Sequence, residues 1–307
     1  MPFLRTLTSL FFLFIISNVQ IHAQTRYIDD LFSNIRKRTY FYADTLKLDF
    51  YDSKLDTASI KPLIVLVHGG GFVAGQRNGG EETTFGETFA KKGFAVASIS
   101  YRLSRKGKGF DCNCPAATKV KTYVEAVDDL NKAIYYLTTY ATKFNIDPDN
   151  IILVGSSAGA ETILNKFILK DNFNFKPVAI QQGKIIGAIS FSGATLDADY
   201  LTSENAVPML FIHGRMDNKV PYASASHHLC NSNTPGYLIL DGPSEIVKKL
   251  RSLNTSYELY SDPEGGHEWA DFGFQQTDLV KNFIYNNILK KIKVQREEII
   301  SKLILKK

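Results

Sequence analysis

A serine framed by glycines at residues 155–159, Gly-Ser-Ser-Ala-Gly, most constrains what this chain can fold into. It directly follows Ile-Ile-Leu-Val at 151–154, a run that is typical of a strand buried on both faces. A strand that turns at once into a helix strains the central residue, and glycines on either side give the backbone the room that this turn needs. We therefore expect Ser157 to stand exposed at the carboxyl edge of a sheet.

A phosphate-binding loop is the competing interpretation of a glycine-rich turn after a strand. Such a loop needs a lysine followed by serine or threonine after its last glycine. Ala160 and Glu161 stand there instead. The sequence therefore excludes this class of nucleotide site at residues 155–159.

Short apolar runs alternate with longer helical patterns along the chain. This alternation predicts an α/β fold with a mostly parallel central sheet, helices on both faces and little or no cap domain. A single domain over residues 24–289 holds the sheet, and a loop at 104–115 is expected over the strand ends, either rimming a pocket or solvated. The expected strands are 39–50, 63–68, 94–101, 151–154, 185–191, 209–213 and 257–260. The expected helices are 119–144, 158–169, 243–253 and 277–289.

The two ends of the chain carry segments of a different kind. Residues 1–23 combine Arg5, a short apolar core and a small residue at 23, which predicts a signal peptide and a secreted or periplasmic protein. An uncleaved membrane anchor is the alternative, although the apolar run is short for a membrane span. Residues 290–307 are expected to form a basic helical extension, either solvated or in contact with a membrane surface or another subunit. The net charge of +5 lies partly in this tail, so no nucleic-acid groove is expected.

Three cysteines are present: Cys112, Cys114 and Cys230. In an oxidising compartment the simplest arrangement is one disulfide and one free thiol. A bridge between Cys112 and Cys114 would close a very tight ring, so we expect Cys230 to pair with one of them. No cluster of His or Cys residues matches a metal site, and none is predicted.

Attack on an ester by a serine needs a base and a group that orients the base. The Ser157 hydroxyl is too weakly acidic to react unassisted, so it needs an imidazole and a carboxylate nearby. His267 is the candidate base because its loop, residues 263–269, is framed by glycines and follows an expected strand. Asp217 is the candidate carboxylate because it follows the strand at 209–213 and a turn.

Other histidines and acids compete for these two roles. His68 and His213 end strands directly before glycine and are expected to be positional, whereas His227 and His228 are expected on the surface of a helical run. The competing carboxylates are Asp197, Asp199, Asp241 and Asp262.

A run of three glycines follows the strand at 63–67. Consecutive glycines let backbone N–H groups point at a substrate oxygen without a side chain in the way. We expect Gly70, Gly71 and the N–H of Ala158 to form an oxyanion hole. Phe72 and Trp269 are candidates to wall an acyl pocket, with core packing as the alternative for each.

Five ordered motifs, taken together, resemble the α/β-hydrolase superfamily, and most of all esterases of the hormone-sensitive-lipase and carboxylesterase type. These motifs are His-Gly-Gly-Gly-Phe at 68–72, Tyr-Arg-Leu at 101–103, Gly-Ser-Ser-Ala-Gly at 155–159, Asp217 and Gly-His at 266–267. The resemblance implies a Ser157, Asp217, His267 triad, no cofactor, and hydrolysis of carboxylic esters through an acyl-enzyme. It also implies a structural role for Asp129.

The apparent lack of an N-terminal helical cap favours small acyl groups. Secreted enzymes that this chain resembles often act on esters of carbohydrates. The resemblance therefore implies acetyl or feruloyl esters of carbohydrates as the substrate class. Two other functions share the scaffold: a serine peptidase of the prolyl-oligopeptidase kind, and a non-catalytic binding module.

Overall fold

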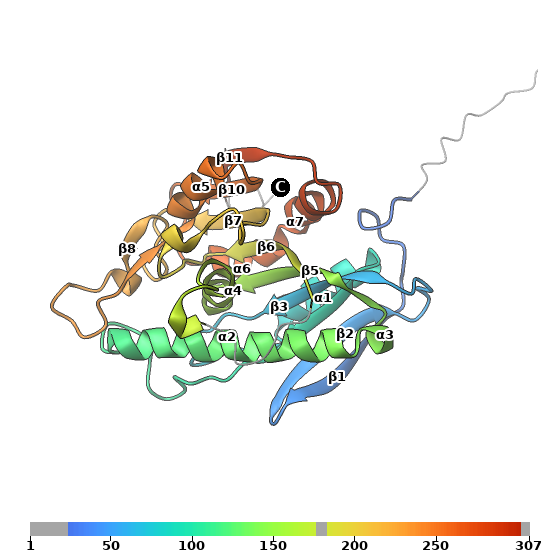
Figure 1. Cartoon of the computed structure of the whole chain (residues 1–307), viewed down its shortest axis with the longest axis horizontal. Coiled ribbons are helices and arrows are strands. Elements are labelled where there is room, and N and C mark those ends of the chain that lie inside the picture. The colour runs from blue at the N-terminus through green and yellow to red at the C-terminus, as the bar shows by residue number, and fades with distance from the viewer. Residues whose placement is uncertain (1–23, 176–182, 302–307) are drawn as a thin grey trace, which may run out of the picture.

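The computed structural model describes residues 24–175 and 183–301, so the expected signal peptide at 1–23 lies outside the described residues. One nine-stranded sheet forms the centre (Figure 1). It is antiparallel between its first three strands and parallel from there on, which confirms the α/β fold. In spatial order the strands are β1 (Ile35–Ala43), β2 (Leu46–Ser53), β4 (Ala95–Ile99), β3 (Lys61–Val67), β5 (Ile146–Ser156), β6 (Ile185–Phe191), β7 (Met209–Gly214), β10 (Tyr257–Asp262) and β11 (Gln295–Ile299).

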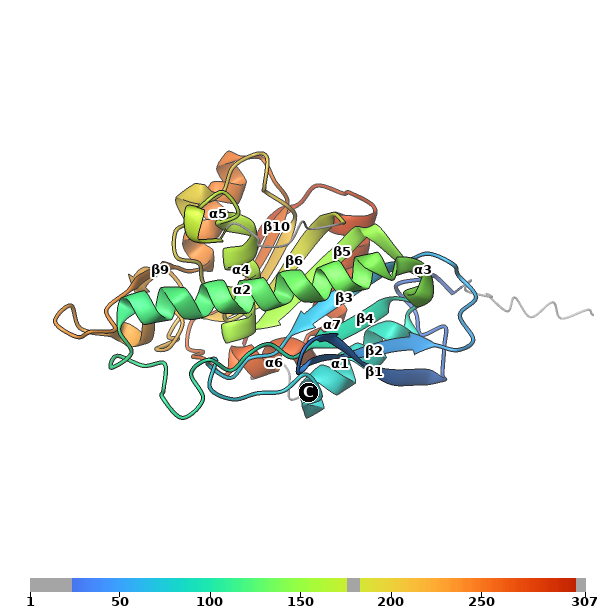
Figure 2. The same ribbon diagram turned by 60° about the horizontal axis from the view of Figure 1, so that its bottom comes forward.

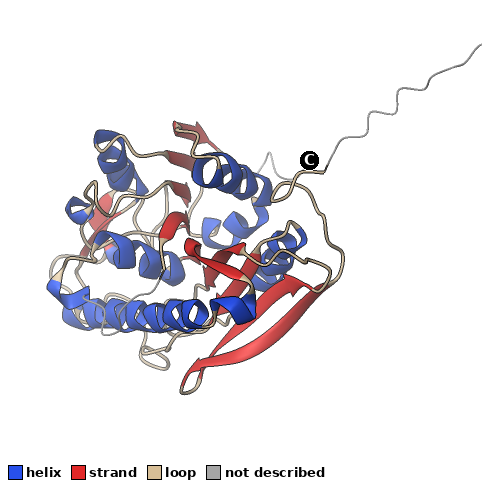
Figure 3. Cartoon of the chain, turned by 45° about the vertical axis from the view of Figure 1, so that its right-hand side comes forward, coloured by secondary structure: helices blue, strands red, loops and turns tan. Residues whose placement is uncertain are grey.

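Helices cover both faces of the sheet because its central strands are apolar on both sides. On β3, for example, Leu63 and Val65 join one apolar cluster, and Ile64 and Leu66 join the other. The first cluster contains α2 (Ala116–Thr139), α4 (Ala158–Ile168) and α5 (Pro243–Ser252). The second contains α1 (Gly80–Lys91), α6 (Trp269–Gln275) and α7 (Thr277–Phe283). Figure 2 shows the long α2 lying along its face, and Figure 3 shows helices on both sides of the strands.

Shorter elements lie mostly at the edges and ends of this core. A separate two-stranded ribbon pairs β8 (Ser224–Ser226) with β9 (Ile239–Asp241). In the described ranges no separate helical domain covers the carboxyl edge of the sheet. The short helical elements are α3 (Ala141–Phe144), η1 (Phe173–Phe175), η2 (Ala198–Tyr200), η3 (His227–Leu229) and the π-helical turn η4 (Ile284–Leu289).

The strand expected over residues 39–50 is wrong in one respect, because the segment is part of a hairpin. β1 and β2 pair antiparallel about the two residues Asp44 and Thr45. A tight turn of this length does not interrupt the alternation of apolar and polar residues, so two short strands resemble one long strand in sequence.

The helical extension expected over residues 290–307 is also wrong where the structure describes it. Residues 295–299 form β11, which pairs parallel with β10. The backbone groups at the open edge of β10 find partners this way, and Ile300 anchors the end of the segment in the second apolar cluster. Ile292 and Ile299, whose spacing suggested a helix, are exposed.

Among residues 24–175 and 183–301, no helix has both the length and the hydrophobicity that crossing a bilayer requires.

Candidate active site

The turn between β5 and α4 holds Ser157 in the left-handed region, with φ +49° and ψ −120°. Glycine is required on both sides of it. A Cβ on Gly155 would lie 2.5 Å from the carbonyl oxygen of Gly159, and a Cβ on Gly159 would lie 2.1 Å from that of Val67. The expected strained turn from strand to helix is therefore present, with Ser157 at its apex.

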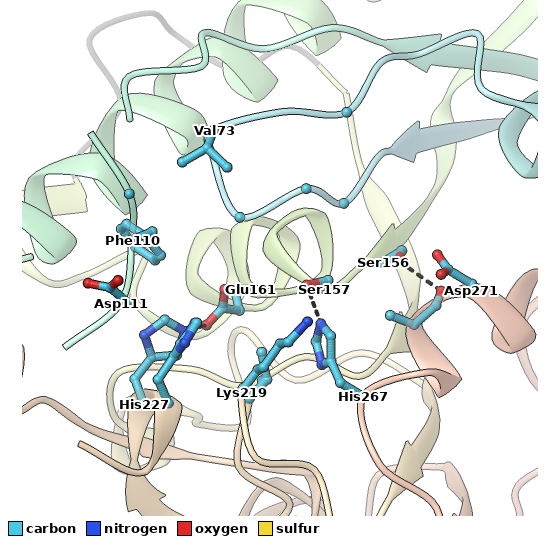
Figure 4. Close-up of a pocket in the computed structure, with 18 of the residues that line it drawn as sticks. Val73, Phe110, Asp111, Ser156, Ser157, Glu161, Lys219, His227, His267 and Asp271 are labelled. Carbon is cyan, nitrogen blue, oxygen red and sulfur yellow. Dashed lines mark hydrogen bonds and ion pairs between the residues drawn. The ribbon is translucent and has the colours of Figure 1, made fainter. Parts of the chain in front are cut away.

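Three side chains from separate loops meet at the carboxyl edge of the sheet. The Ser157 Oγ lies 2.9 Å from His267 Nε2 (Figure 4). His267 Nδ1 lies 2.8 Å from Asp217 Oδ2. The three residues follow β5, β10 and β7, which are parallel strands whose ends lie on one edge. The structure thus brings the three predicted residues together in one hydrogen-bonded series.

Asp217 is buried and held as an anion. The backbone N–H groups of Lys219 and Val220 donate to its Oδ1 at 2.8 and 3.0 Å. Burial raises the pKa of this carboxyl, but hydrogen bonds from His213 and His267 outweigh burial and hold the pKa well below its usual range. The carboxylate therefore stays ionised and can orient the His267 imidazole.

The competing acids serve other contacts. Asp262 accepts from the indole Nε1 of Trp269 at 2.9 Å, and Asp241 accepts from the backbone N–H of Ala198. Asp197 accepts from the N–H of Asp199. In the described part of the chain, no hydrogen bond or ion pair joins any of these acids to His267.

The triple-glycine loop after β3 leaves amides available beside Ser157. Gly70 has φ +110°, and a Cβ there would lie 2.2 Å from the Ala74 carbonyl oxygen, so only glycine fits. Among the described residues no backbone hydrogen bond uses the N–H groups of Gly70, Gly71 or Ala158. Such free donors are what an oxyanion hole consists of.

His68 supports this loop from below. Its ring stacks on that of Tyr101 at 4.4 Å, and the Tyr101 hydroxyl donates to the His68 carbonyl oxygen at 3.0 Å. Burial lowers the pKa of His68 to about 4, so its ring is neutral at pH 7. His68 is thus a positional residue, as expected from its place at a strand end.

Solved structures resemble this arrangement over most of the chain. Esterase 2 from Thermogutta terrifontis superposes with a TM-score of 0.60 at 18% identity, covering 81% of this chain and 92% of that one. A family model described as BD-FAE matches residues 48–195. The chain has the α/β-hydrolase fold.

Curated relatives match this chain over shorter stretches. A probable isoprenylcysteine alpha-carbonyl methylesterase of rice, Oryza sativa subsp. japonica, is 30% identical over 114 residues, which is 37% of this chain and 23% of that protein. Phenmedipham hydrolase of Pseudarthrobacter oxydans is 31% identical over 131 residues, or 40% of this chain and 23% of that protein. The chain therefore spans less than a quarter of the length of these two relatives in the matched region.

A cavity of about 590 Å³ opens over Ser157 and His267. Figure 4 shows Phe110, Asp111 and His227 to one side of Ser157, and Asp271 to the other. Phe110 and Asp111 belong to the loop at 104–115, so of the two alternatives for this loop the one that it rims a pocket holds. The described ranges contain no cluster of three or more His, Cys, Asp or Glu side chains placed to hold a metal ion.

The prediction that Phe72 and Trp269 wall the pocket is wrong. Both side chains are fully buried, and neither lines the cavity. Phe72 has φ +60°, and its ring packs against Phe110 at 4.8 Å. Trp269 points into the other core, where it donates to Asp262. The alternative of core packing holds for both.

The sequence interpretation missed most polar residues of the cavity, Glu161 and His227 among them. His227 is buried, which contradicts its expected place on a helical surface, and it lies in the short turn η3. The signal for Glu161 was its spacing, since a residue four positions after Ser157 lies on the same face of the helix.

Two further contacts fix the loop that rims the cavity. Cys112 and Cys230 form a disulfide, and Cys114 is a buried free thiol, so the expected pairing of Cys230 is confirmed and resolved. Arg102 donates from its Nε and its backbone N–H to Asp129 on α2 at 2.8 and 2.9 Å. Asp129 is therefore structural, as the resemblance implied.

Proposed function

We propose that this α/β-hydrolase is a carboxylic ester hydrolase that forms an acyl-enzyme on Ser157. The observation that carries the proposal is the continuous hydrogen-bonded series from Ser157 Oγ through His267 to Asp217, next to amides with no backbone partner. The names of similar proteins, a methylesterase and an esterase among them, support the same chemistry.

The reaction follows from the roles of these three side chains. Ser157 Oγ attacks the ester carbonyl carbon while His267 Nε2 takes the hydroxyl proton, and Asp217 stabilises the imidazolium that forms. As the C–O bond to the alcohol breaks, the imidazolium gives that proton to the leaving oxygen. Water then attacks the acyl-enzyme with His267 again as base, which releases the carboxylic acid and restores the serine.

Negative charge gathers on the former carbonyl oxygen in both steps. The N–H groups of Gly70, Gly71 and Ala158 are the donors proposed to bind it. Each donor of this kind is typically worth about 3 kcal/mol of transition-state stabilisation. No cofactor is needed for this chemistry, because the side chains supply both the nucleophile and the proton transfers.

Short-acyl esters are the proposed substrates, with acetyl or feruloyl esters of carbohydrates as the preferred class. The cavity of about 590 Å³ supports this, since it is of the size of small-molecule sites. The proposal includes export by the segment at 1–23, and the Cys112–Cys230 disulfide supports an oxidising compartment. Beyond the ester substrate it needs no partner, neither nucleic acid nor a membrane surface.

A comparison of two chromogenic substrates tests the proposal. Purified protein is expected to hydrolyse p-nitrophenyl acetate and to leave a proline-linked p-nitroanilide peptide intact. Ser157→Ala should lower kcat by about 1,000-fold or more, because the nucleophile is lost. The melting temperature should change by no more than a few degrees. Ser203→Ala, which alters an exposed serine away from the cavity, is the matched control and should retain full turnover.

Two results would contradict the proposal. Faster cleavage of the peptide than of the ester would favour the peptidase, and no turnover of either substrate would favour a binding module.

A further inference from the structure

The cavity continues from Ser157 toward polar side chains that ester hydrolysis itself does not use. Glu161 lies one helical turn along α4, about 6 Å along the axis, and its backbone N–H donates to the Ser157 carbonyl oxygen at 2.8 Å. Figure 4 shows its carboxyl directed toward His227, on the side of Ser157 opposite Asp271. Both Glu161 and His227 line the cavity.

The contacts of this pair leave one atom of each without a hydrogen-bond partner. The Tyr123 hydroxyl donates to Glu161 Oε1 at 2.9 Å, and His227 Nε2 lies 3.4 Å from the same oxygen. Within the described residues no hydrogen bond or ion pair engages Glu161 Oε2, and His227 Nδ1 is buried without a partner. Glu161 is 2% exposed and His227 is 1% exposed. Buried polar atoms seldom lack a partner, so two unbonded atoms in side chains that line a cavity mark a place where a ligand group can bind.

Both groups are uncharged at neutral pH. Burial raises the pKa of the Glu161 carboxyl to about 8, and burial lowers the pKa of the His227 imidazole well below its usual value. A protonated carboxyl donates one hydrogen bond, and a neutral imidazole accepts one at its unprotonated nitrogen. A hydroxyl group is the simplest ligand that accepts the first and donates the second. The pair carries no charge to attract a carboxylate or an ammonium group.

The surroundings hold the pair in place. The Phe110 ring meets that of His227 edge to face at 5.3 Å. The Cys112–Cys230 disulfide joins the loop that carries Phe110 to the segment that carries His227. Rigid support of this kind is what a binding subsite needs in order to select one ligand group.

We propose that Glu161 and His227 form a subsite for an uncharged hydroxyl group of the ester substrate. This inference rests on the proposed ester hydrolysis and makes its substrate class narrower. The hydroxyl belongs either to the acyl group, as in a hydroxycinnamoyl ester, or to the alcohol, as in a sugar. In either case an ester that lacks the hydroxyl leaves two buried polar atoms unbonded, which costs binding in the transition state.

Two pairs of esters test the subsite, each pair differing by one hydroxyl. Methyl cinnamate and its para-hydroxy derivative vary the acyl group, and cyclohexyl acetate and the monoacetate of trans-cyclohexane diol vary the alcohol. For at least one pair, the wild-type kcat/KM should be about tenfold or more higher for the hydroxylated member. The pair that shows this preference identifies which part of the substrate occupies the subsite.

Variants then assign the preference to Glu161. Glu161→Met keeps the length of the side chain and removes its polar atoms, so the ratio within the pair should fall to about one. Glu161→Gln keeps a donor in the same shape and should retain most of the ratio. Asp271→Asn, the matched change at the opposite end of the cavity, should leave the ratio as in wild type. A residue with only a structural role would change both members of a pair equally.

The outcomes separate this inference from the proposed function. Turnover of p-nitrophenyl acetate by wild-type protein with no preference in either pair overturns the subsite and leaves ester hydrolysis standing, whether or not the variants fold. A ratio that is unchanged in Glu161→Met, or lost in Glu161→Gln, also overturns it. Absence of all ester turnover overturns both.

Discussion

A proton on Glu161 links the chemistry of the cavity to the stability of the fold. Burial raises the pKa of this carboxyl from 4.5 to about 8 in the folded chain. The unfolded chain therefore releases the proton above pH 4.5, whereas the folded chain keeps it up to about pH 8. Because the folded state binds the extra proton, its stability falls as pH rises through this window. A buried acid that destabilises the fold as pH rises is expected to be retained where function requires it.

Glu161→Gln is expected to remove the loss of folding stability that the wild type shows as pH rises. The variant should gain stability relative to wild type as pH rises from 5 to 8, by about 3 kcal/mol in all, since one pKa unit corresponds to about 1.4 kcal/mol. Urea unfolding of both proteins at several pH values measures the difference. A difference in unfolding free energy that stays constant across this range would show that Glu161 does not hold the proton.

Single residues were predictable from sequence where a motif and a strand end acted together. Ser157, Asp217 and His267 each follow a strand of one parallel sheet, so chain order alone placed them at a common edge. Phe72 was not predictable, because its left-handed backbone turns the ring into the core rather than the cavity. Nothing local in a sequence reveals the direction of an aromatic ring next to a glycine run.

At the scale of elements, buried strands were the most predictable features. A continuous apolar run such as that of β6 indicates a buried strand, and the bounds expected for β6 match those observed. The segment around His227 was not predictable in the same way. His228 and Leu229 adopt left-handed conformations, with φ +59° and +50°, so the apparent helical run ends in a tight turn. β11 was missed because pairing with a distant strand overrode its local pattern.

The disulfide joins two elements that are 118 residues apart in the chain. Replacing both Cys112 and Cys230 by serine should lower the unfolding free energy by roughly 2–5 kcal/mol, because the unfolded chain loses a long-range constraint. It should also reduce any preference for hydroxylated esters, since the link between the two loops of the cavity is lost. Chemical denaturation and the paired esters measure the two effects. Cys114→Ser, which leaves the bridge intact, is the control.

An unchanged stability in the double serine variant would mean that packing alone holds these loops together. In that case the disulfide would have no part in shaping the cavity.

At the scale of the whole molecule, the α/β-hydrolase sheet explains how residues from distant segments meet. Parallel strands bring their carboxyl ends to one edge, and the loops there supply the glycine amides, the serine, the acid and the histidine in chain order. Sequence could predict this architecture because central strands such as β3, β4 and β7 are buried on both faces and helices such as α2 and α5 bury one apolar face. It could not predict the polar end of the cavity, which depends on a disulfide and a short turn coming together in space.

Covalent labelling tests the central claim most directly. The protein is treated with a fluorophosphonate, its intact mass is recorded, and the modified peptide is sequenced by mass spectrometry. One adduct is expected, on Ser157, and it should be absent in Ser157→Ala even though Ser156 stands beside it in the sequence. An adduct on another residue, or no adduct on a folded wild-type protein, would contradict the assignment of Ser157 as an activated nucleophile.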